Sequence, residues 1–292
     1  MKKKVIGYIF SEKNLGKDEK IFLKLAKKKN IELVMFNLLK DYDDKGIEKK
    51  IKKCNLIFNN SAEESAIELV KTIEELGKKV IESSRAYYYL EDKWMFFLLC
   101  KKNKIPTIKT ILLSENLLLA KRELKKFNYW PVILKRIEGT CGEYVEKAGN
   151  ISQALAIIKK FWKKGRKKLP IIAQEFIKSY SYRVTVIGDR IMQTAIKENR
   201  NWKCTGVYAK KIKKFKLNKK LKKIIKKIIK SAKLKIFGLD FLKDKKTKNW
   251  LVLEINSVPA LDFFEDEREK LINKILDFLK KQANQDINSL TS

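Results

Sequence analysis

Residues Trp250–Leu261 read WLVLEINSVPAL, a stretch that combines the pattern of a buried strand with two polar side chains. Five of its first six residues are apolar, the exception being Glu254, and Asn256 follows two positions later. Because successive side chains of a strand alternate between its faces, Glu254 and Asn256 point the same way. An ionised carboxylate without a partner is costly to bury, so positive charge is expected on that face.

Asp240 lies fourteen residues before Glu254, in a second apolar stretch, FGLDFL. Two antiparallel strands joined by the polar turn KDKKTKN would bring Asp240 beside Glu254 and Asn256. Three oxygen ligands on one face suit one or two magnesium ions that also hold substrate phosphates. The alternative that stays open is that Glu254 pairs with a lysine and Asn256 only closes a turn before Pro259.

The chain has no histidine, which excludes Ser-His-Asp and Cys-His catalysis and histidine-ligated metals. Carboxylates, amides, lysines and arginines remain, and this set suits hard cations and phosphate. The four cysteines, at positions 54, 100, 141 and 204, are too far apart for C-x-x-C pairing, which favours reduced thiols. No apolar stretch reaches the roughly 18 to 20 residues of a membrane-spanning helix, so we expect a cytoplasmic protein without membrane contact.

The composition, with 45% hydrophobic and 35% charged residues among 292, is typical of a globular chain with a full core. Up to about residue 90, apolar runs such as KVIGYIF and IELVMFN alternate with helical spacing, which predicts a small parallel α/β domain. Beyond it, YWPVILKRIEGTCGEYVEKAGN predicts two strands around a glycine turn, with Ser152 capping the next helix. Three further strand signals follow Pro170.

The net charge of +34 raises the question of a nucleic-acid partner. Arginine occupies eight positions against sixty lysines, and the lysines are spread along the chain, which favours a general compositional bias. A very basic helix is expected over about residues 218–235, with an apolar stripe packed on the sheet and lysines facing solvent. We therefore expect no nucleic-acid partner, and a basic RNA- or ribosome-binding protein without turnover stays open as an alternative.

Lys135 ends the apolar run PVILK, directly before the glycine-containing turn RIEGTCGE. A glycine turn after a strand can aim backbone N–H groups at phosphate oxygens, with a lysine supplying charge. A lysine that is only solvated at the end of its strand is the competing interpretation.

Taken in order, these segments resemble the ATP-grasp fold and, within it, the RimK-like amino-acid ligases, over nearly the whole chain. FGLDFL and VLEINSVPAL are similar to the family's metal-binding pair GVDLL and VLEVNxxPGL. ILKRIEGTCGEYV is similar to its lysine strand and phosphate loop. Further similar segments are the Asp92-Lys93 pair with the strand entry IPT, the nucleotide segment IIAQEFI, and the strand pair YRVTVIGDRI.

The resemblance implies an α/β N-terminal domain followed by an α+β ATP-grasp module of two subdomains. The expected bounds are 1–90 for the N-terminal pre-ATP-grasp domain, 91–170 for subdomain A, 171–283 for subdomain B and 284–292 for a tail. It also implies ATP and Mg²⁺ (or Mn²⁺) as cofactors. The implied site residues are Lys93, Lys135, Glu175 and Phe176 for ATP, Arg183 and Lys203 for catalysis, and Asp240, Glu254 and Asn256 for the metal.

The implied activity is that of an ATP-dependent carboxylate–amine ligase. It would join an amino acid, with glutamate favoured, to a carboxylate acceptor through an acyl phosphate. The acceptor would be a peptide, a protein tail or a cofactor. Other ATP-grasp specificities, glutathione-synthetase-like or amino-acid-carrier-lysine ligation, stay open, and so does a homo-oligomeric state.

Three segments depart from the family pattern. Tyr144 stands where the family's phosphate loop usually has its last glycine, which predicts a stiffer loop. The family's DIR reads Ser181-Tyr182-Arg183 here, so the acidic residue is absent. The family's FRSN reads Trp202-Lys203-Cys204-Thr205, so Lys203 takes the place of an arginine and Thr205 that of an asparagine. Because a lysine lacks the two-pronged guanidinium of arginine, Lys203 should hold phosphate less directionally.

Overall fold

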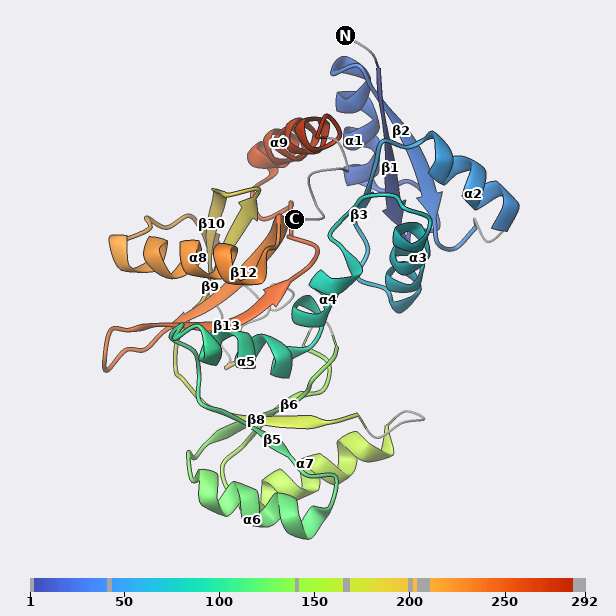
Figure 1. Cartoon of the computed structure of the whole chain (residues 1–292). Helices are drawn as coiled ribbons and strands as arrows, with labels where there is room; N and C mark the ends of the chain where they lie inside the picture. Colours follow the sequence, from blue (N-terminus) through green and yellow to red (C-terminus); the bar gives the residue numbers. More distant parts are fainter. Residues whose placement is uncertain are drawn as a thin grey trace.

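The computed structural model describes residues 3–40, 44–139, 142–164, 169–198, 202–203 and 211–285. Within these residues the chain forms three β-sheets, each built from a different part of the sequence and flanked by helices (Figure 1). No helix in the described ranges is long and apolar enough to cross a membrane. The expected order, an α/β domain followed by an α+β module, is confirmed.

The first sheet is parallel, with the strand order β2-β1-β3-β4, as the alternating apolar runs before residue 90 predicted. Its helices flank the strands (Figure 1). The elements are β1 (Lys4–Phe10), α1 (Lys17–Lys28), β2 (Ile31–Asn37), α2 (Asp44–Lys53), β3 (Leu56–Asn59), α3 (Glu64–Glu75) and β4 (Val80–Ile81).

The second sheet is antiparallel, with the order β5-β8-β6-β7, and helices α6 and α7 pack on it through one buried core. β8 follows the expected subdomain boundary at residue 170, yet it pairs with β5 and β6, so this sheet continues to Glu175. The expected helix cap Ser152 is wrong, because Asn150 accepts the capping hydrogen bond from the Gln153 amide. The elements are β5 (Thr110–Leu113), α6 (Leu117–Phe127), β6 (Val132–Arg136), β7 (Val145–Ala148), α7 (Ile151–Lys163) and β8 (Ile171–Glu175).

The third sheet is antiparallel, with the order β11-β10-β9-β12-β13, and carries α5 and α8 on one face. Val184 and Leu239 of the sheet share a buried core with Ile225 of α8. Because strand side chains alternate, Arg183 and Asp240 then face the other side. The elements are α4 (Ser84–Leu90), α5 (Lys93–Lys102), β9 (Ser181–Ile187), β10 (Arg190–Glu198), β11 (Lys211–Lys213), α8 (Lys219–Ala232), β12 (Ile236–Lys243) and β13 (Trp250–Asn256).

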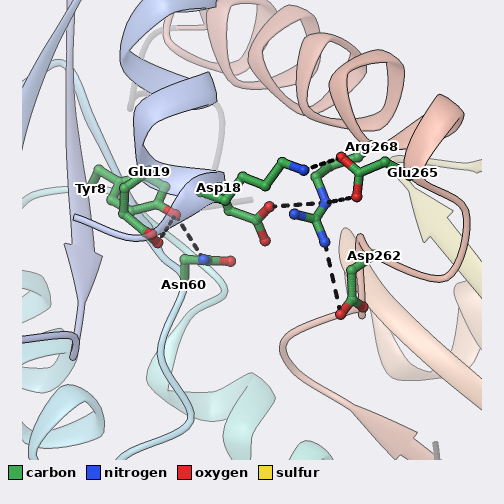
Figure 2. A network of polar contacts seen from close by, with 8 residues as sticks. Tyr8, Asp18, Glu19, Asn60, Asp262, Glu265 and Arg268 are labelled. Atoms are coloured by element: carbon green, nitrogen blue, oxygen red, sulfur yellow. Dashed lines mark hydrogen bonds and ion pairs between the residues drawn. The ribbon is translucent and has the colours of Figure 1, made fainter. Parts of the chain in front are cut away.

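The last helix, α9 (Glu265–Gln282), returns the chain to the first sheet and lies beside α1 (Figure 1). Figure 2 shows how Arg268 of α9 joins three parts of the molecule. Its guanidinium lies 3.6 Å from the carboxylate of Asp18 on α1, 3.6 Å from Glu265, and 3.9 Å from Asp262 in the segment after β13. The N-terminal domain is thereby tied to the segment that follows Asn256.

Candidate active site

A cavity of about 580 Å³ lies between the second and third sheets. Its walls come from β6 and β8 on one side and from β9, β10, β12 and β13 on the other. The structure brings every residue that the sequence predicted for the site to this one cavity, while their individual roles stay predictions. These residues are Lys93, Lys135, Glu175, Phe176, Arg183, Lys203, Asp240, Glu254 and Asn256.

Asp240 of β12 is buried in the cavity wall and is held by two cations. Its Oδ1 accepts hydrogen bonds from Arg183 Nε (2.8 Å) and Lys197 Nζ (2.9 Å), and its Oδ2 accepts one from Arg183 Nη2 (2.7 Å). The strand register produces this contact, because Asp240 pairs with Arg183 on β9 and with Glu254 on β13. The expected pairing of the two strands across KDKKTKN is thus confirmed.

The charges of this cluster stabilise one another. Burial by itself raises the pKa of Asp240, but Arg183 and Lys197 outweigh it and hold that pKa well below its usual range. Burial also lowers the pKa of Arg183, and the neighbouring Asp240 more than offsets this, so the net shift is upward. The carboxylate therefore stays ionised and both of its oxygens are engaged.

Gly238, two residues before Asp240, makes room for the guanidinium. A Cβ atom at this position would lie 2.3 Å from Arg183 Nη1, a distance that no real Cβ contact shows. Gly238 pairs with Thr185 of β9 and with Asn256 of β13, so the space that its missing side chain leaves lies between two neighbouring strands. The glycine of FGLDFL is therefore required by packing around Arg183.

Glu254 and Asn256 face the cavity from β13, as strand alternation predicted. Asn256 Nδ2 lies 3.4 Å from Asp240 Oδ2, and its own Oδ1 accepts no hydrogen bond from the residues that the structure describes. Glu254 is half-buried and likewise has no hydrogen bond or ion pair within the described part of the chain, although it lies near enough to Arg183 to raise that pKa. Two oxygen donors on this wall are thus available to a ligand.

On the side of the cavity opposite β13, Lys93 and Lys135 lie next to the turn between β6 and β7. Lys93, the first residue of α5, donates from Nζ to the carbonyls of Gly139 (2.9 Å) and Ile137 (3.4 Å). Asp92 caps the same helix by accepting from two backbone amides of its first turn. Lys135 is buried at the end of β6 and lines the cavity. One lysine therefore holds the turn, and the other supplies charge to the cavity; Thr140 and Cys141 of the turn lie outside the described residues.

Tyr144, on the far side of this turn, adopts a φ of +50°, a conformation that glycine adopts most readily. Its ring lies 3.6 Å from the Arg136 guanidinium and edge-on to Phe161. Arg136 is itself buried and donates to the carbonyls of Phe161 and Lys164 at the end of α7. The tyrosine thus anchors the turn to α7, which gives the expected stiffening a physical basis.

Glu175 is the last residue of β8 and Phe176 follows it, and both line the other end of the cavity. Lys147 Nζ lies 4.9 Å from the centre of the Phe176 ring and 5.8 Å from that of Trp202, so a cation bridges the two rings. Lys203 Nζ lies 5.6 Å from the Trp202 ring. The neighbouring departures at Cys204 and Thr205 lie outside the described residues.

Sequence reasoning did not predict several polar residues of the cavity, among them Gln174, Glu91 and, most prominently, Lys197. It is only 2% exposed, and strand alternation places it with Gln193 and Ala195 on the buried face of β10. The alternation of Gln193, Ala195 and Lys197 along β10, the strand that follows that of Arg183, was the signal in the sequence that could have revealed Lys197. It was hidden because sixty lysines make any single lysine inconspicuous.

Gln174 and Glu91 also line the cavity. Gln174 Nε2 donates to Thr110 Oγ1 (3.0 Å), whereas its buried Oε1 has no partner among the described residues. Glu91 accepts from the hydroxyl of Ser257 (2.7 Å), and burial raises its pKa. Gln174 is the first residue of the QEFI segment, and Glu91 directly precedes Asp92-Lys93, so their place in the sequence was the only signal.

Comparison with known proteins places these features in context. Residues 90–279 match the family described as RimK-like ATP-grasp domain. A probable alpha-L-glutamate ligase of Haemophilus influenzae is 27% identical over 232 residues, which are 77% of this chain and 74% of that protein. The coenzyme gamma-F420-2:alpha-L-glutamate ligase of Methanocaldococcus jannaschii is 25% identical over 223 residues, 74% and 75% of the two chains. The fold is similar to the crystal structure of a RimK domain ATP-grasp protein from Sphaerobacter thermophilus, with a TM-score of 0.71, 15% identity, and 94% and 99% of the two chains covered.

Proposed function

The chain belongs to the RimK-like ATP-grasp family and is an ATP-dependent ligase, and on this basis we propose that it joins the amine of glutamate to a carboxylate acceptor. Both relatives described above are α-L-glutamate ligases by name, which supports glutamate as the amine. The observation that carries the proposal is the single cavity in which Lys135, Glu254 and the cluster of Arg183, Asp240 and Lys197 meet.

For the nucleotide, we propose that the phosphates lie against the turn between β6 and β7, near Lys93 and Lys135. The base would lie toward Glu175 and Phe176. Gln174 Oε1, buried and without a partner among the described residues, suits the exocyclic amino group of adenine. A buried acceptor is costly to leave unpaired, so a donor on the ligand supplies what the protein lacks.

Magnesium fits the donor set on the β13 wall. Hard cations take carboxylate and amide oxygens, and Glu254 and Asn256 Oδ1 are both available there. Asp240 differs, because its Oδ1 already accepts from both Arg183 and Lys197. A metal would have to be reached by Oδ2, which accepts from Arg183 Nη2 (2.7 Å) and lies 3.4 Å from Asn256 Nδ2. When bound, the ion would neutralise charge on the ATP phosphates.

The proposed reaction has two steps. A carboxylate oxygen of the acceptor attacks the γ-phosphorus of ATP, the bond to the bridging oxygen breaks, and ADP leaves. The amine nitrogen of glutamate then attacks the acyl carbon, phosphate leaves, and the nitrogen loses a proton. Negative charge moves among phosphate and carboxylate oxygens in both steps, which the fixed cations Lys135, Arg183 and Lys203 stabilise together with Lys197. Because Asp240 already holds two of them, they need little rearrangement.

The test incubates the protein with ATP, magnesium, and pools of amino acids and carboxylate acceptors. We expect ADP formation that needs both pools, and a product heavier than its acceptor by one glutamate residue. With an ¹⁸O-labelled acceptor carboxylate, the released phosphate should carry one labelled oxygen. Lys135→Met serves as the inactive control. ADP formation that ignores the amine, or phosphate without label, would contradict the proposed reaction.

A further inference from the structure

Fourteen exposed lysines from three segments form one continuous surface, which we call the basic face. Its segments are α8 with Lys233 after it, the end of α5 through Lys104, and the turn between β12 and β13, which lie on the same side of the molecule (Figure 1). Lys220 Nζ donates to the Asn249 side chain (2.6 Å), and Lys227 Nζ to the carbonyl of Lys104 (3.3 Å), so the segments touch. The lysines are Lys101, Lys102, Lys104, Lys219, Lys220, Lys222, Lys223, Lys226, Lys227, Lys230, Lys233, Lys245, Lys246 and Lys248.

This surface carries almost no negative charge. Asp244 is the one carboxylate in the three segments, and it accepts hydrogen bonds within its own turn, from the Thr247 hydroxyl (2.7 Å) and the Lys246 amide (2.9 Å). None of the fourteen lysines forms an ion pair with a described residue. On the opposite part of the molecule, lysines of α1 do face carboxylates of α9, as Lys24 faces Glu269. A uniform lysine bias would not separate the two surfaces in this way.

Helix stability gives no reason for this arrangement. α8 has seven lysines and no acidic residue, and Lys219 and Lys220 occupy its first turn, where the helix dipole favours negative charge. Like charges three or four positions apart also repel one another. By contrast, α1 and α9 both have acidic residues in the first turn and lysines in the last turn. The charge of α8 is therefore kept against the preference of the helix.

The basic face lies on the side of the third sheet away from the cavity. Ile225 of α8 packs with Val184 and Leu239, whereas Arg183 and Asp240 of the same strands face the cavity. A partner bound to these lysines would leave the cavity open. The lysines can also be replaced without touching the groups proposed to bind ATP.

We propose that the basic face binds the phosphate backbone of a nucleic acid without sequence preference. Protein interfaces are depleted in lysine and centred on aromatic or aliphatic anchors, and no exposed large apolar side chain lies in these three described segments. Nucleic-acid interfaces are polar and strongly positive, as this face is. The three segments expose no arginine and no aromatic ring, and the exposed ring of Tyr180 lies at their edge, 5.7 Å from Lys245 Nζ. Phosphate contacts rather than base contacts therefore dominate this face. The sequence alone favoured compositional bias over a nucleic-acid partner. It does not show that the three segments form one surface or that this surface has almost no acidic residues.

The experiment compares two fivefold lysine-to-glutamine variants with the unmodified chain. The first changes Lys219, Lys222, Lys223, Lys226 and Lys230, whose side chains form no hydrogen bond to a described residue. The matched control changes five exposed lysines of the N-terminal domain, Lys20, Lys27, Lys28, Lys49 and Lys53. Glutamine has nearly the helix propensity of lysine, and both variants lose the same charge. Fluorescence anisotropy measures binding to a single-stranded RNA and a DNA duplex of about 20 nucleotides, from about 50 to 200 mM salt.

We expect the control to bind both nucleic acids as the unmodified chain does. The basic-face variant should lose at least about tenfold in affinity. Its negative slope of log K against log salt should become shallower, by about 3 to 4. Its thermal melt and its ATP-dependent activity should not change, which separates this proposal from the proposed function. Equal affinity of the two variants, or a flat salt response, would overturn the proposal. Tighter binding to a polyglutamate peptide of equal charge would overturn it in favour of an acidic protein partner.

Discussion

The guanidinium of Arg183 and the carboxylate of Asp240 form a two-point ion pair between neighbouring strands, with nitrogen–oxygen distances of 2.8 and 2.7 Å. Lys197 adds a second cation to the same carboxylate, at 2.9 Å. All three side chains are buried, so each depends on the others for its counter-charge. The cluster therefore contributes to folding as well as to the charge of the cavity.

Replacing Asp240 by Asn keeps its size and removes the counter-charge of Arg183 and Lys197. We expect the free energy of unfolding at pH 7 to fall by roughly 3–5 kcal/mol, because two buried cations lose their partner. Urea denaturation measures this loss. Asp244→Asn, in an exposed turn, is the control and should change stability little.

The same variant gives a pH test. The pKa of Asp240 is lowered in the folded state, so its stabilisation is fully present above the unfolded pKa of about 4 and is lost as pH falls further. The stability difference between the unmodified chain and Asp240→Asn should thus shrink as pH falls below about 4. A difference that stayed the same from about pH 5 to pH 3 would contradict this assignment.

Gly238→Ala tests the position of Arg183. The added Cβ would meet the guanidinium at 2.3 Å, so Arg183 has to move and its pair with Asp240 must weaken. We expect ligase turnover to fall by about tenfold or more while the chain still folds. Gly149→Ala is a suitable control, because its new Cβ would meet only the flexible end of Gln153 at 3.3 Å. Equal turnover in the two variants would show that the exact place of Arg183 does not matter.

Glu82 should give the folding stability a second pH dependence, opposite in sign to that of Asp240. Burial raises its pKa to about 7, although its carboxylate accepts from the backbone amides of Ile236 (2.6 Å) and Lys235 (2.7 Å). Between its ordinary pKa of 4.5 and about 7, the folded chain holds a proton that the unfolded chain has lost. Stability should therefore decrease as pH rises through this window, by up to about 1.4 kcal/mol per unit, and level off above it.

Glu82→Gln removes this titration and keeps an acceptor for the two amides. Urea denaturation from about pH 5 to 8 should show the variant gaining stability relative to the unmodified chain as pH rises. A constant difference across this range would mean that Glu82 does not titrate there.

Substitutions of Tyr144 by glycine and by phenylalanine should differ in their effect on ATP binding. Glycine relieves the positive φ but removes the ring from Arg136 and Phe161, whereas phenylalanine keeps the ring. We expect Tyr144→Gly to raise the KM for ATP several-fold, because the turn near Lys93 loses its anchor on α7. Tyr144→Phe should stay close to the unmodified chain. Steady-state kinetics at varied ATP decide between them, and a lower KM for the glycine variant would show that the anchoring hinders binding.

Strand pairing could be predicted because it depends on local pattern. Alternation placed Glu254 and Asn256 on one face, and the short polar turn after Lys243 limited the partner strand to β12. The resemblance to the ATP-grasp family then brought distant segments into one site, which the cavity confirms as a common location.

Other features depend on contacts that no local pattern contains. β8 joins the second sheet because it pairs with β5 and β6, although the turn signals around Pro170 mark only its start. Asn150 rather than Ser152 caps α7, since residues of both types can cap and only the chain entry selects one. Lys197 and the basic face were hidden for one reason: a lysine-rich sequence does not distinguish a buried or clustered lysine from a solvated one.

The most direct test of the account is the magnesium dependence of ADP formation by the unmodified chain and by Glu254→Gln. The substitution keeps the size of a cavity-facing side chain and removes a charge that would face a divalent cation. We predict that metal-dependent turnover falls by orders of magnitude, with saturation shifted to higher magnesium, while a parallel thermal melt stays nearly unchanged. An identical magnesium curve with full activity in the variant would contradict the assignment of this cavity as the ATP- and metal-binding site.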